Sequence, residues 1–197
     1  MTEKILSGRI ALITGANQGL GREISRSYVT AGADVMLCAR NYDLLEKVEL
    51  ELNPLLGKNQ KICIKKCDVT NENEVNALVH DTLDKLGGCQ ILVNNAGIYG
   101  PKGAIEDQDW DEWKKAIEIN VFGSVLMCRA LIPHFKRHKY GKIIQLSGGG
   151  ATKPLPNLSV YATSKAAIVR FADTLAEEVR CFGIDVNAIA PGALNTN

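Results

Sequence analysis

A tyrosine and a lysine stand four residues apart, at Tyr161 and Lys165, near the start of the stretch 159–179, whose apolar residues recur at helical spacing. Residues i and i+4 are neighbours on a helix surface. If that face lines a cleft, the ammonium favours the phenolate and lowers the tyrosine pKa from its usual value of about 10. Such a tyrosine can act as a general acid or base. A solvated pair would do nothing notable, so the rest of the chain decides.

The elements that must position this pair alternate between apolar runs and amphipathic stretches. Strands are expected within 9–14, 34–40, 61–69, 90–97, 141–150 and 183–192, and helices within 20–32, 42–53, 71–87, 109–138 and 159–179. Asn71 can cap one helix and Gly87 can stop it, and Pro133 is expected to end or kink the long helix. Continuous apolar strands indicate a parallel sheet buried on both faces. The pattern predicts one domain over 1–197, a doubly wound Rossmann-type α/β sheet with helices on both faces.

Ligands of such sheets bind at the carboxyl ends of the strands. The first strand runs into "TGANQGLG", in which Gly15, Gly19 and Gly21 allow a tight turn and let backbone N–H groups approach a pyrophosphate. The helix that follows directs the positive end of its dipole at that anion. Because the motif lies between a strand and a helix, it predicts nucleotide binding rather than a simple turn.

Arg40 follows the second strand, at the place where an NAD site would carry an acidic residue for the ribose 2′-hydroxyl. A carboxylate there would repel a 2′-phosphate, whereas a guanidinium can bind one. The arginine and the missing acid both favour NADP(H) over NAD(H).

Four further features allow two readings each. Asp68 after the third strand can accept from an adenine amino group or cap the next helix, and 94–97 ("NNAG") can approach a nucleotide or form a turn. Ser147 after the fifth strand can face the cleft or serve a turn. Asn120 is a poor helix-interior residue, so it either holds a kink or water or is a satisfied structural amide.

Composition excludes several classes of function. The 197 residues are 46% hydrophobic and 23% charged with a net charge of +1, so nothing indicates a nucleic-acid partner. The apolar runs are shorter than the roughly 18 residues that a membrane helix requires. The six cysteines show no zinc spacing and are expected to be free, mostly buried thiols. We expect a cytoplasmic protein.

Taken together, the motifs resemble the short-chain dehydrogenase/reductase family over 9–196. The matching pieces are "TGANQGLG", "DV" at Asp68, "NNAG", "IN" at Asn120, Ser147, "YATSK" and "PGALNT". The GxxxGxG spacing is similar to that of the shorter-chain branch. Members of this branch usually continue for some fifty residues beyond the last motif, with a substrate loop and a seventh strand, so the natural protein is expected to be longer.

The resemblance implies a catalytic tetrad of Asn120, Ser147, Tyr161 and Lys165. Tyr161 would exchange a proton with the substrate oxygen, Ser147 would hydrogen-bond that oxygen, Lys165 would lower the Tyr161 pKa and hold the nicotinamide ribose, and Asn120 would hold a water. The cofactor would be bound by Gly15, Asn17, Gln18, Gly19, Leu20, Gly21, Arg40, Asp68, Val69, Asn94, Ala96, Gly97, Tyr161, Lys165, Pro191, Gly192 and Thr196. A second basic residue that often precedes the second glycine is replaced by Gln18.

These features predict an NADP(H)-dependent oxidoreductase that interconverts a small-molecule secondary alcohol and a ketone, as a homodimer or homotetramer. One alternative is reduction of 3-oxoacyl chains on acyl carrier protein, for which the basic segment 134–142 ("HFKRHKYGK") would need to lie at the cleft mouth. The other is a nucleotide-binding scaffold without catalysis. The presence of all four tetrad residues favours an enzyme.

Overall fold

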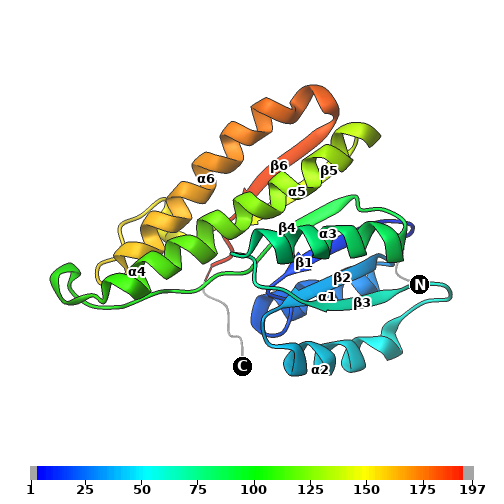
Figure 1. Ribbon diagram of the computed structural model, residues 1–197, viewed down its shortest axis with the longest axis horizontal. Helices are drawn as coiled ribbons and strands as arrows, with labels where there is room; N and C mark the ends of the chain where they lie inside the picture. Colours follow the sequence, from blue (N-terminus) through cyan, green and yellow to red (C-terminus); the bar gives the residue numbers. More distant parts are fainter. Residues whose placement is uncertain (1–3, 193–197) are drawn as a thin grey trace.

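Six parallel strands form one sheet with helices packed on both faces in the computed structural model, which describes residues 4–192 (Figure 1). The strands are β1 (Ile10–Thr14), β2 (Asp34–Ala39), β3 (Ile62–Lys66), β4 (Ile91–Asn94), β5 (Gly141–Leu146) and β6 (Ile184–Ile189). Their order across the sheet is β3-β2-β1-β4-β5-β6, which places the topological switch point between β1 and β4. This is the predicted Rossmann-type α/β fold, and it is confirmed.

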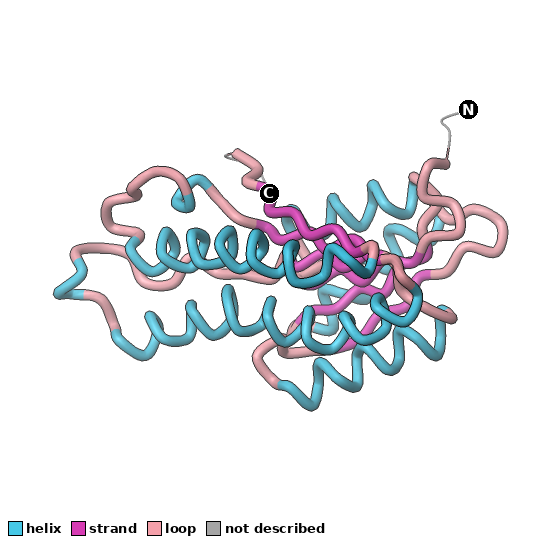
Figure 2. Tube along the Cα trace, turned by 90° about the horizontal axis from the view of Figure 1, so that it is seen from above, coloured by secondary structure: helices cyan, strands magenta, loops and turns pink. Residues whose placement is uncertain are grey.

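The two faces of the sheet are covered by different helices. Helices α1 (Gly19–Thr30) and α2 (Tyr42–Leu52) cover one face, while α3 (Glu72–Leu86), α5 (Gly123–His138) and α6 (Ser159–Val179) cover the other (Figures 1 and 2). The inner strands β1, β2 and β4 are buried along nearly their whole length, as the continuous apolar runs predicted. The outer strand β6 instead alternates between buried Ile184 and Val186 and exposed Asp185 and Asn187.

Short polar residues begin the helices that follow β2 and β3. The Asn41 side chain accepts from the backbone N–H of Leu44 at the start of α2, and the Asn71 side chain accepts from Asn73 and Glu74 at the start of α3. Helix α3 ends at Gly87, whose φ of 82° is the left-handed conformation that glycine adopts freely. Asn71 and Gly87 therefore do what the sequence predicted of them.

The long helix expected over 109–138 consists of three segments. Helix α4 (Trp110–Ile117) runs into a π-helical turn, η3 (Glu118–Phe122), which continues into α5. Pro133 lies inside α5 and does not end it, because the helix continues to His138 and Lys139 terminates it with a φ of 50°. The prediction that Pro133 could end the helix was wrong, and the irregular point lies instead at Asn120.

This run, Trp110–His138, is also long and apolar enough to cross a membrane by length and composition, although the sequence analysis expected no such stretch. Of its most apolar window, 44% is buried inside the protein. Met127, Leu131 and Phe135 form part of the core under the sheet. Packing of these side chains in the core accounts for part of the hydropathy of the run.

Candidate active site

The turn between β1 and α1 is shaped by three glycines, each for a physical reason. Gly15 and Gly19 have φ angles of 63° and 52°, which residues with side chains rarely adopt. A Cβ at Gly21 would overlap the carbonyl oxygen of Gly15. No side chain of residue 18 caps α1, so the first N–H groups of the helix are left to a ligand.

The loop that follows the neighbouring strand β4 holds the glycine turn in place by hydrogen bonds. The Asn95 side chain donates to the carbonyl oxygens of Thr14 and Gly15 at 2.9 and 3.1 Å, and the Thr14 hydroxyl accepts from the backbone N–H groups of Asn95 and Ala96 at 3.0 Å each. The sequence analysis chose Asn94 as a cofactor residue. Its side chain instead points under α5, where it donates to Ser124 O and Cys128 Sγ. Asn95, one position later, is the asparagine that supports the glycine turn.

A cavity of ≈ 780 Å³ runs along the carboxyl ends of the strands. Of the predicted cofactor residues, those that line it are Gly15, Asn17, Gln18, Gly19, Leu20, Gly21, Arg40, Asp68, Val69, Ala96, Gly97, Tyr161, Lys165, Pro191 and Gly192. Thr196 lies outside the described residues. A volume of this size, a glycine cradle and a free helix N-terminus fit a dinucleotide, in agreement with the motif-based prediction.

The second and third strands deliver Arg40 and Asp68 to one end of this cavity. Arg40 directly follows β2 and is exposed to solvent. One Asp68 carboxylate oxygen accepts from the N–H and the hydroxyl of Thr70, at 3.0 and 2.8 Å. Asn71, rather than Asp68, caps α3, so the capping alternative for Asp68 is wrong. Asp68 shapes the wall where the adenine is expected.

Asn120 is buried in the π-helical turn and fully engaged. Its amide donates to Ile98 O at 2.8 Å and to Ser164 Oγ at 2.9 Å, while its oxygen accepts from Ile98 N at 2.8 Å. Both amide hydrogens are used, so the side chain works as a brace between the loop after β4 and α6. The water that the family resemblance assigned to Asn120 would have to bind at a remaining oxygen lone pair.

The other three tetrad residues meet at the opposite end of the cavity from Arg40. Ser147 follows β5 and donates from Oγ to Lys165 O at 3.2 Å, and Lys165 Nζ donates to Leu146 O at 2.7 Å. The Tyr161 hydroxyl lies beside the next residue, because a Cβ built at Gly148 would be 2.5 Å from that oxygen. Ser147, Tyr161 and Lys165 all line the cavity.

The protonation equilibria differ from the sequence-based expectation. Burial, assisted by the nearby Tyr99, raises the pKa of Tyr161, whereas Lys165 was expected to lower it. Burial lowers the pKa of Lys165 to about 8. The physical reason is desolvation, which disfavours the charged form of each group and is the largest cause of both shifts. The Lys165 ammonium lies 5.7 Å from the centre of the Tyr161 ring.

Tyr99 is a residue at this site that the sequence analysis missed. Its ring lies 4.7 Å from the Tyr161 ring, centroid to centroid, and Lys102 Nζ lies 5.1 Å from the Tyr99 ring centre. Tyr99 lines the cavity and is 55% exposed. Its position directly after "NNAGI" was the only feature of the sequence that could have placed it at the site.

Over residues 4–192 no cluster of His, Cys, Asp and Glu could hold a metal ion.

Comparison with known proteins identifies the family to which the chain belongs. The family model described as short chain dehydrogenase matches residues 9–197. The chain belongs to the short-chain dehydrogenase family. It is 36% identical to dehydrogenase/reductase SDR family member 7B of Rattus norvegicus over 98% of this chain and 60% of that protein, and 36% identical to the 7alpha-hydroxysteroid dehydrogenase of Escherichia coli over 98% of this chain and 73% of that protein.

Solved structures of family members share the arrangement. The 3-ketoacyl-(acyl-carrier-protein) reductase from Brucella melitensis, solved in complex with NADH, superimposes with a TM-score of 0.91 at 34% identity, over 97% of this chain and 78% of that one. The chain thus spans about three fifths to three quarters of the lengths of these short-chain dehydrogenase relatives.

Proposed function

We propose that the protein is an NADP(H)-dependent oxidoreductase that interconverts a secondary alcohol and a ketone on a small molecule. The observation that carries the proposal is the convergence of Ser147, Tyr161 and Lys165 at one end of a cavity whose other end is a glycine cradle with a free helix N-terminus. Membership of the short-chain dehydrogenase family supports the reaction class.

Each residue has a distinct task in this reaction. NADP(H), when bound, supplies the hydride chemistry. The Tyr161 hydroxyl gives a proton to the ketone oxygen or takes one from the alcohol, and Ser147 hydrogen-bonds the same oxygen as charge develops on it. Lys165 carries a positive charge below about pH 8, and that charge favours the phenolate form of Tyr161. Asn120 keeps the loop at Ile98 and helix α6 in register.

The choice of NADP(H) rests on Arg40, which lies on the cavity wall after β2 with no acidic residue beside it. An NADH complex exists for the Brucella melitensis relative, so the preference needs its own test. We expect NADPH to bind more tightly than NADH in a nicotinamide fluorescence titration, and Arg40→Gln to remove the difference. Equal or stronger NADH binding would contradict the NADP(H) assignment and leave the reaction class intact.

The acid–base role is tested separately. Tyr161→Phe should bind NADPH as the wild type does and lose most turnover in a screen of ketones and secondary alcohols. Full turnover in this variant would refute the role of Tyr161. Nucleotide binding without turnover of any ketone or secondary alcohol in this screen would favour the scaffold alternative.

Reduction of 3-oxoacyl chains on a carrier protein loses its main structural support. The basic segment 134–142 covers the end of α5 and the amino-terminal end of β5. The cavity lies at the opposite, carboxyl end of that strand, where Ser147 lines it. His134 and Phe135 of the segment are buried. The segment is therefore not at the mouth of the cavity.

We retain a cytoplasmic location and a homodimer or homotetramer as part of the proposal. The oligomeric state is to be checked by light scattering.

A further inference from the structure

The segment that joins β4 to α4 brings a lysine, Lys102, to the catalytic end of the ≈ 780 Å³ cavity. Lys102 Nζ lies 5.1 Å from the centre of the Tyr99 ring, and that ring lies 4.7 Å from the ring of Tyr161. Both tyrosines line the cavity. The ammonium is therefore no farther from the Tyr161 ring centre than these two distances laid end to end. A cation thus stands beside the space where the substrate oxygen must meet Tyr161.

The backbone on both sides of Lys102 is fixed by its neighbours. A Cβ built at Gly100 would lie 2.6 Å from Val160 Cγ1, so the chain passes close against the first turn of α6 before it reaches Lys102. After Lys102, the N–H of Gly103 donates to the carbonyl oxygen of Asn157 at 3.0 Å. Lys102 is therefore presented from a turn that is attached to the same helix, and to the same loop before it, that position Tyr161.

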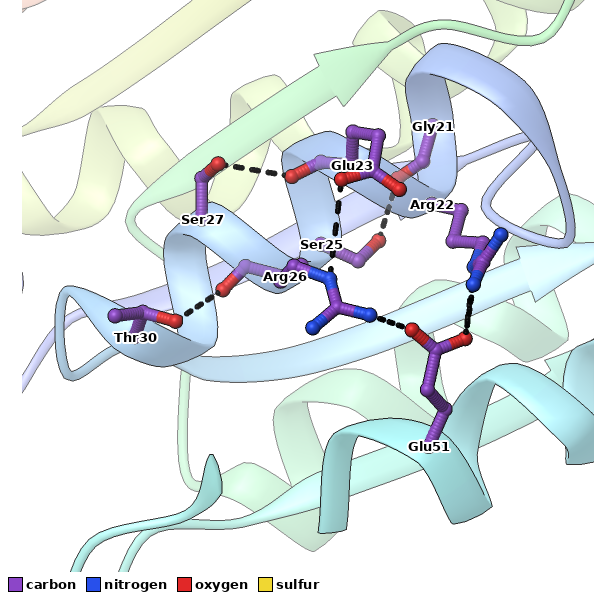
Figure 3. A network of polar contacts seen from close by, with 8 residues as sticks. All are labelled: Gly21, Arg22, Glu23, Ser25, Arg26, Ser27, Thr30 and Glu51. Atoms are coloured by element: carbon purple, nitrogen blue, oxygen red, sulfur yellow. Dashed lines mark hydrogen bonds and ion pairs between the residues drawn. The ribbon is translucent and has the colours of Figure 1, made fainter. Parts of the chain in front are cut away.

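The charge of Lys102 is available to a ligand. Arg22 and Arg26, at the start of α1, are engaged by Glu51 of α2 (Figure 3). Within residues 4–192, by contrast, no carboxylate forms an ion pair with Lys102. An ammonium has three N–H donors, and the face of the Tyr99 ring satisfies only part of them. Lys102 can therefore donate to an anionic acceptor at the edge of the cavity.

We infer that the substrate is an oxo acid or the corresponding hydroxy acid, whose carboxylate binds to Lys102 while its ketone or hydroxyl oxygen meets Tyr161. The inference rests on the proposed function and deepens it by naming the substrate class. A carboxylate accepts a charge-assisted hydrogen bond from an ammonium. A single ammonium is a point charge that suits a singly charged carboxylate better than a phosphate monoester, which carries up to about two charges.

The structural alternative is that Lys102 only covers the exposed ring of Tyr99. Loss of such a cover would change the wall of the cavity and affect charged and neutral ketones alike. Loss of a carboxylate-binding cation would affect only ligands that carry the charge. Lys115, at an exposed position on α4, offers a matched control, because Lys115→Gln removes the same charge from another part of the surface.

The test compares 5-oxohexanoate with its neutral amide, 5-oxohexanamide, which share the ketone and the chain length. Binding is measured by ligand-detected NMR titration in the presence of saturating NADP⁺, since the oxidised cofactor cannot reduce a ketone and no turnover interferes. We expect the wild type to bind the oxo acid about threefold to fivefold more tightly than the amide, as an exposed ion pair predicts. Raising the salt concentration should reduce this preference.

The variants assign the preference to a residue. Lys102→Gln should bring the ratio of the two affinities close to one, and Lys102→Arg, which keeps the charge, should retain most of the preference. Lys115→Gln should leave the ratio as it is in the wild type. If Lys102→Gln and Lys115→Gln lower the ratio equally, the preference comes from the overall charge and the inference is wrong. If Lys102→Gln weakens both ligands equally, Lys102 only covers the ring.

Failure of the inference and failure of the proposed function give different results. If the wild type binds both ligands equally, prefers the amide, or binds neither while it turns over neutral ketones, the substrate class is wrong and the proposed function stands. If it binds neither ligand and turns over no ketone or secondary alcohol, the proposed function fails and the substrate class fails with it.

Discussion

Lys165 donates its ammonium hydrogen bond to the backbone oxygen of Leu146, at 2.7 Å, at the end of strand β5. This bond attaches helix α6 to the strand that carries Ser147. It also holds the ammonium 5.7 Å from the Tyr161 ring centre while both residues face the cavity. Lys165 is buried, and the single carbonyl does not replace the hydration of an ammonium.

This burial predicts a pH-dependent stability. The pKa of Lys165 is about 8 in the folded protein, lowered from 10.5. The unfolded chain therefore binds more protons between these values, so the contribution of Lys165 to the free energy of unfolding rises as pH rises from about 8 to 10.5. In urea unfolding, the free energy of unfolding of Lys165→Met should exceed that of the wild type most below pH 8. This difference should shrink by on the order of 3 kcal/mol towards pH 10.5. If the free energies of unfolding of the two proteins run parallel from pH 8 to 10.5, the burial argument is contradicted.

The contact between Tyr99 and Tyr161 predicts separate effects on turnover and on its pH profile. Tyr99→Phe keeps the ring pair, and Tyr99→Leu removes it. An aromatic pair contributes about 0.5–1.5 kcal/mol, so the leucine variant should lose up to about tenfold in kcat and the phenylalanine variant little. Because Tyr99 helps to raise the pKa of Tyr161, both variants should move the alkaline limb of the profile to lower pH. If the alkaline limb stays at the same pH in both Tyr99 variants, the influence of Tyr99 on the pKa of Tyr161 is excluded.

The hydrogen bonds of Asn120 predict a large stability loss without a large change in volume. Asn120→Ala would leave the part-buried N–H and C=O of Ile98 without their side-chain partner, at a cost of up to about 1–3 kcal/mol for each group. Asn73→Ala, at an exposed position on α3, serves as the comparison. Equal unfolding midpoints for the two variants in urea would show that Asn120 is not a brace.

The close approach of Gly21 to Gly15 predicts that a single methyl group disrupts the nucleotide site. Gly21→Ala would force α1 away from the turn, because its Cβ would overlap the Gly15 carbonyl. NADPH affinity should fall by more than tenfold. Gly149→Ala is the control, since a Cβ there meets nothing within 4 Å. Retained affinity in Gly21→Ala would mean that the turn can relax without losing its ligand.

Much of the site follows from the sequence because strand ends are easy to locate. The apolar runs that end at Thr14, Ala39 and Leu146 fix which residues reach the carboxyl edge of the sheet, and the glycine spacing between β1 and α1 fixes the cradle. The sequence analysis named Asn94 and not Asn95, whereas in the structure the Asn95 side chain supports the glycine turn, because only the residue after the strand turns toward β1. Both are asparagine, and side-chain direction at a strand end is not visible in residue type.

Other features depend on tertiary structure. The hydrophobic spacing of 110–138 is that of one helix, and the π-helical turn at Asn120 is stabilised by bonds to Ile98, which is distant in sequence. The direction of the Tyr161 pKa shift depends on how far the phenol is buried, which no local motif records. A cavity of ≈ 520 Å³ lined by Gln18, Arg22 and Glu51, among others, arises only when α1 and α2 pack side by side.

The π-helical turn between α4 and α5 sets the rotational phase of everything that precedes it. In an α-helix each residue advances the chain by about 100°. A π turn accommodates one residue more than an α turn, so α4 presents a different face from the one that an unbroken α-helix through the same residues would present. Removing one residue from 118–122 would give a regular helix and preserve the core at Met127 and Leu131. Because the π turn absorbs one extra residue, α4 would keep its orientation after the deletion, but the widened turn that brings Asn120 to the loop at Ile98 would be lost.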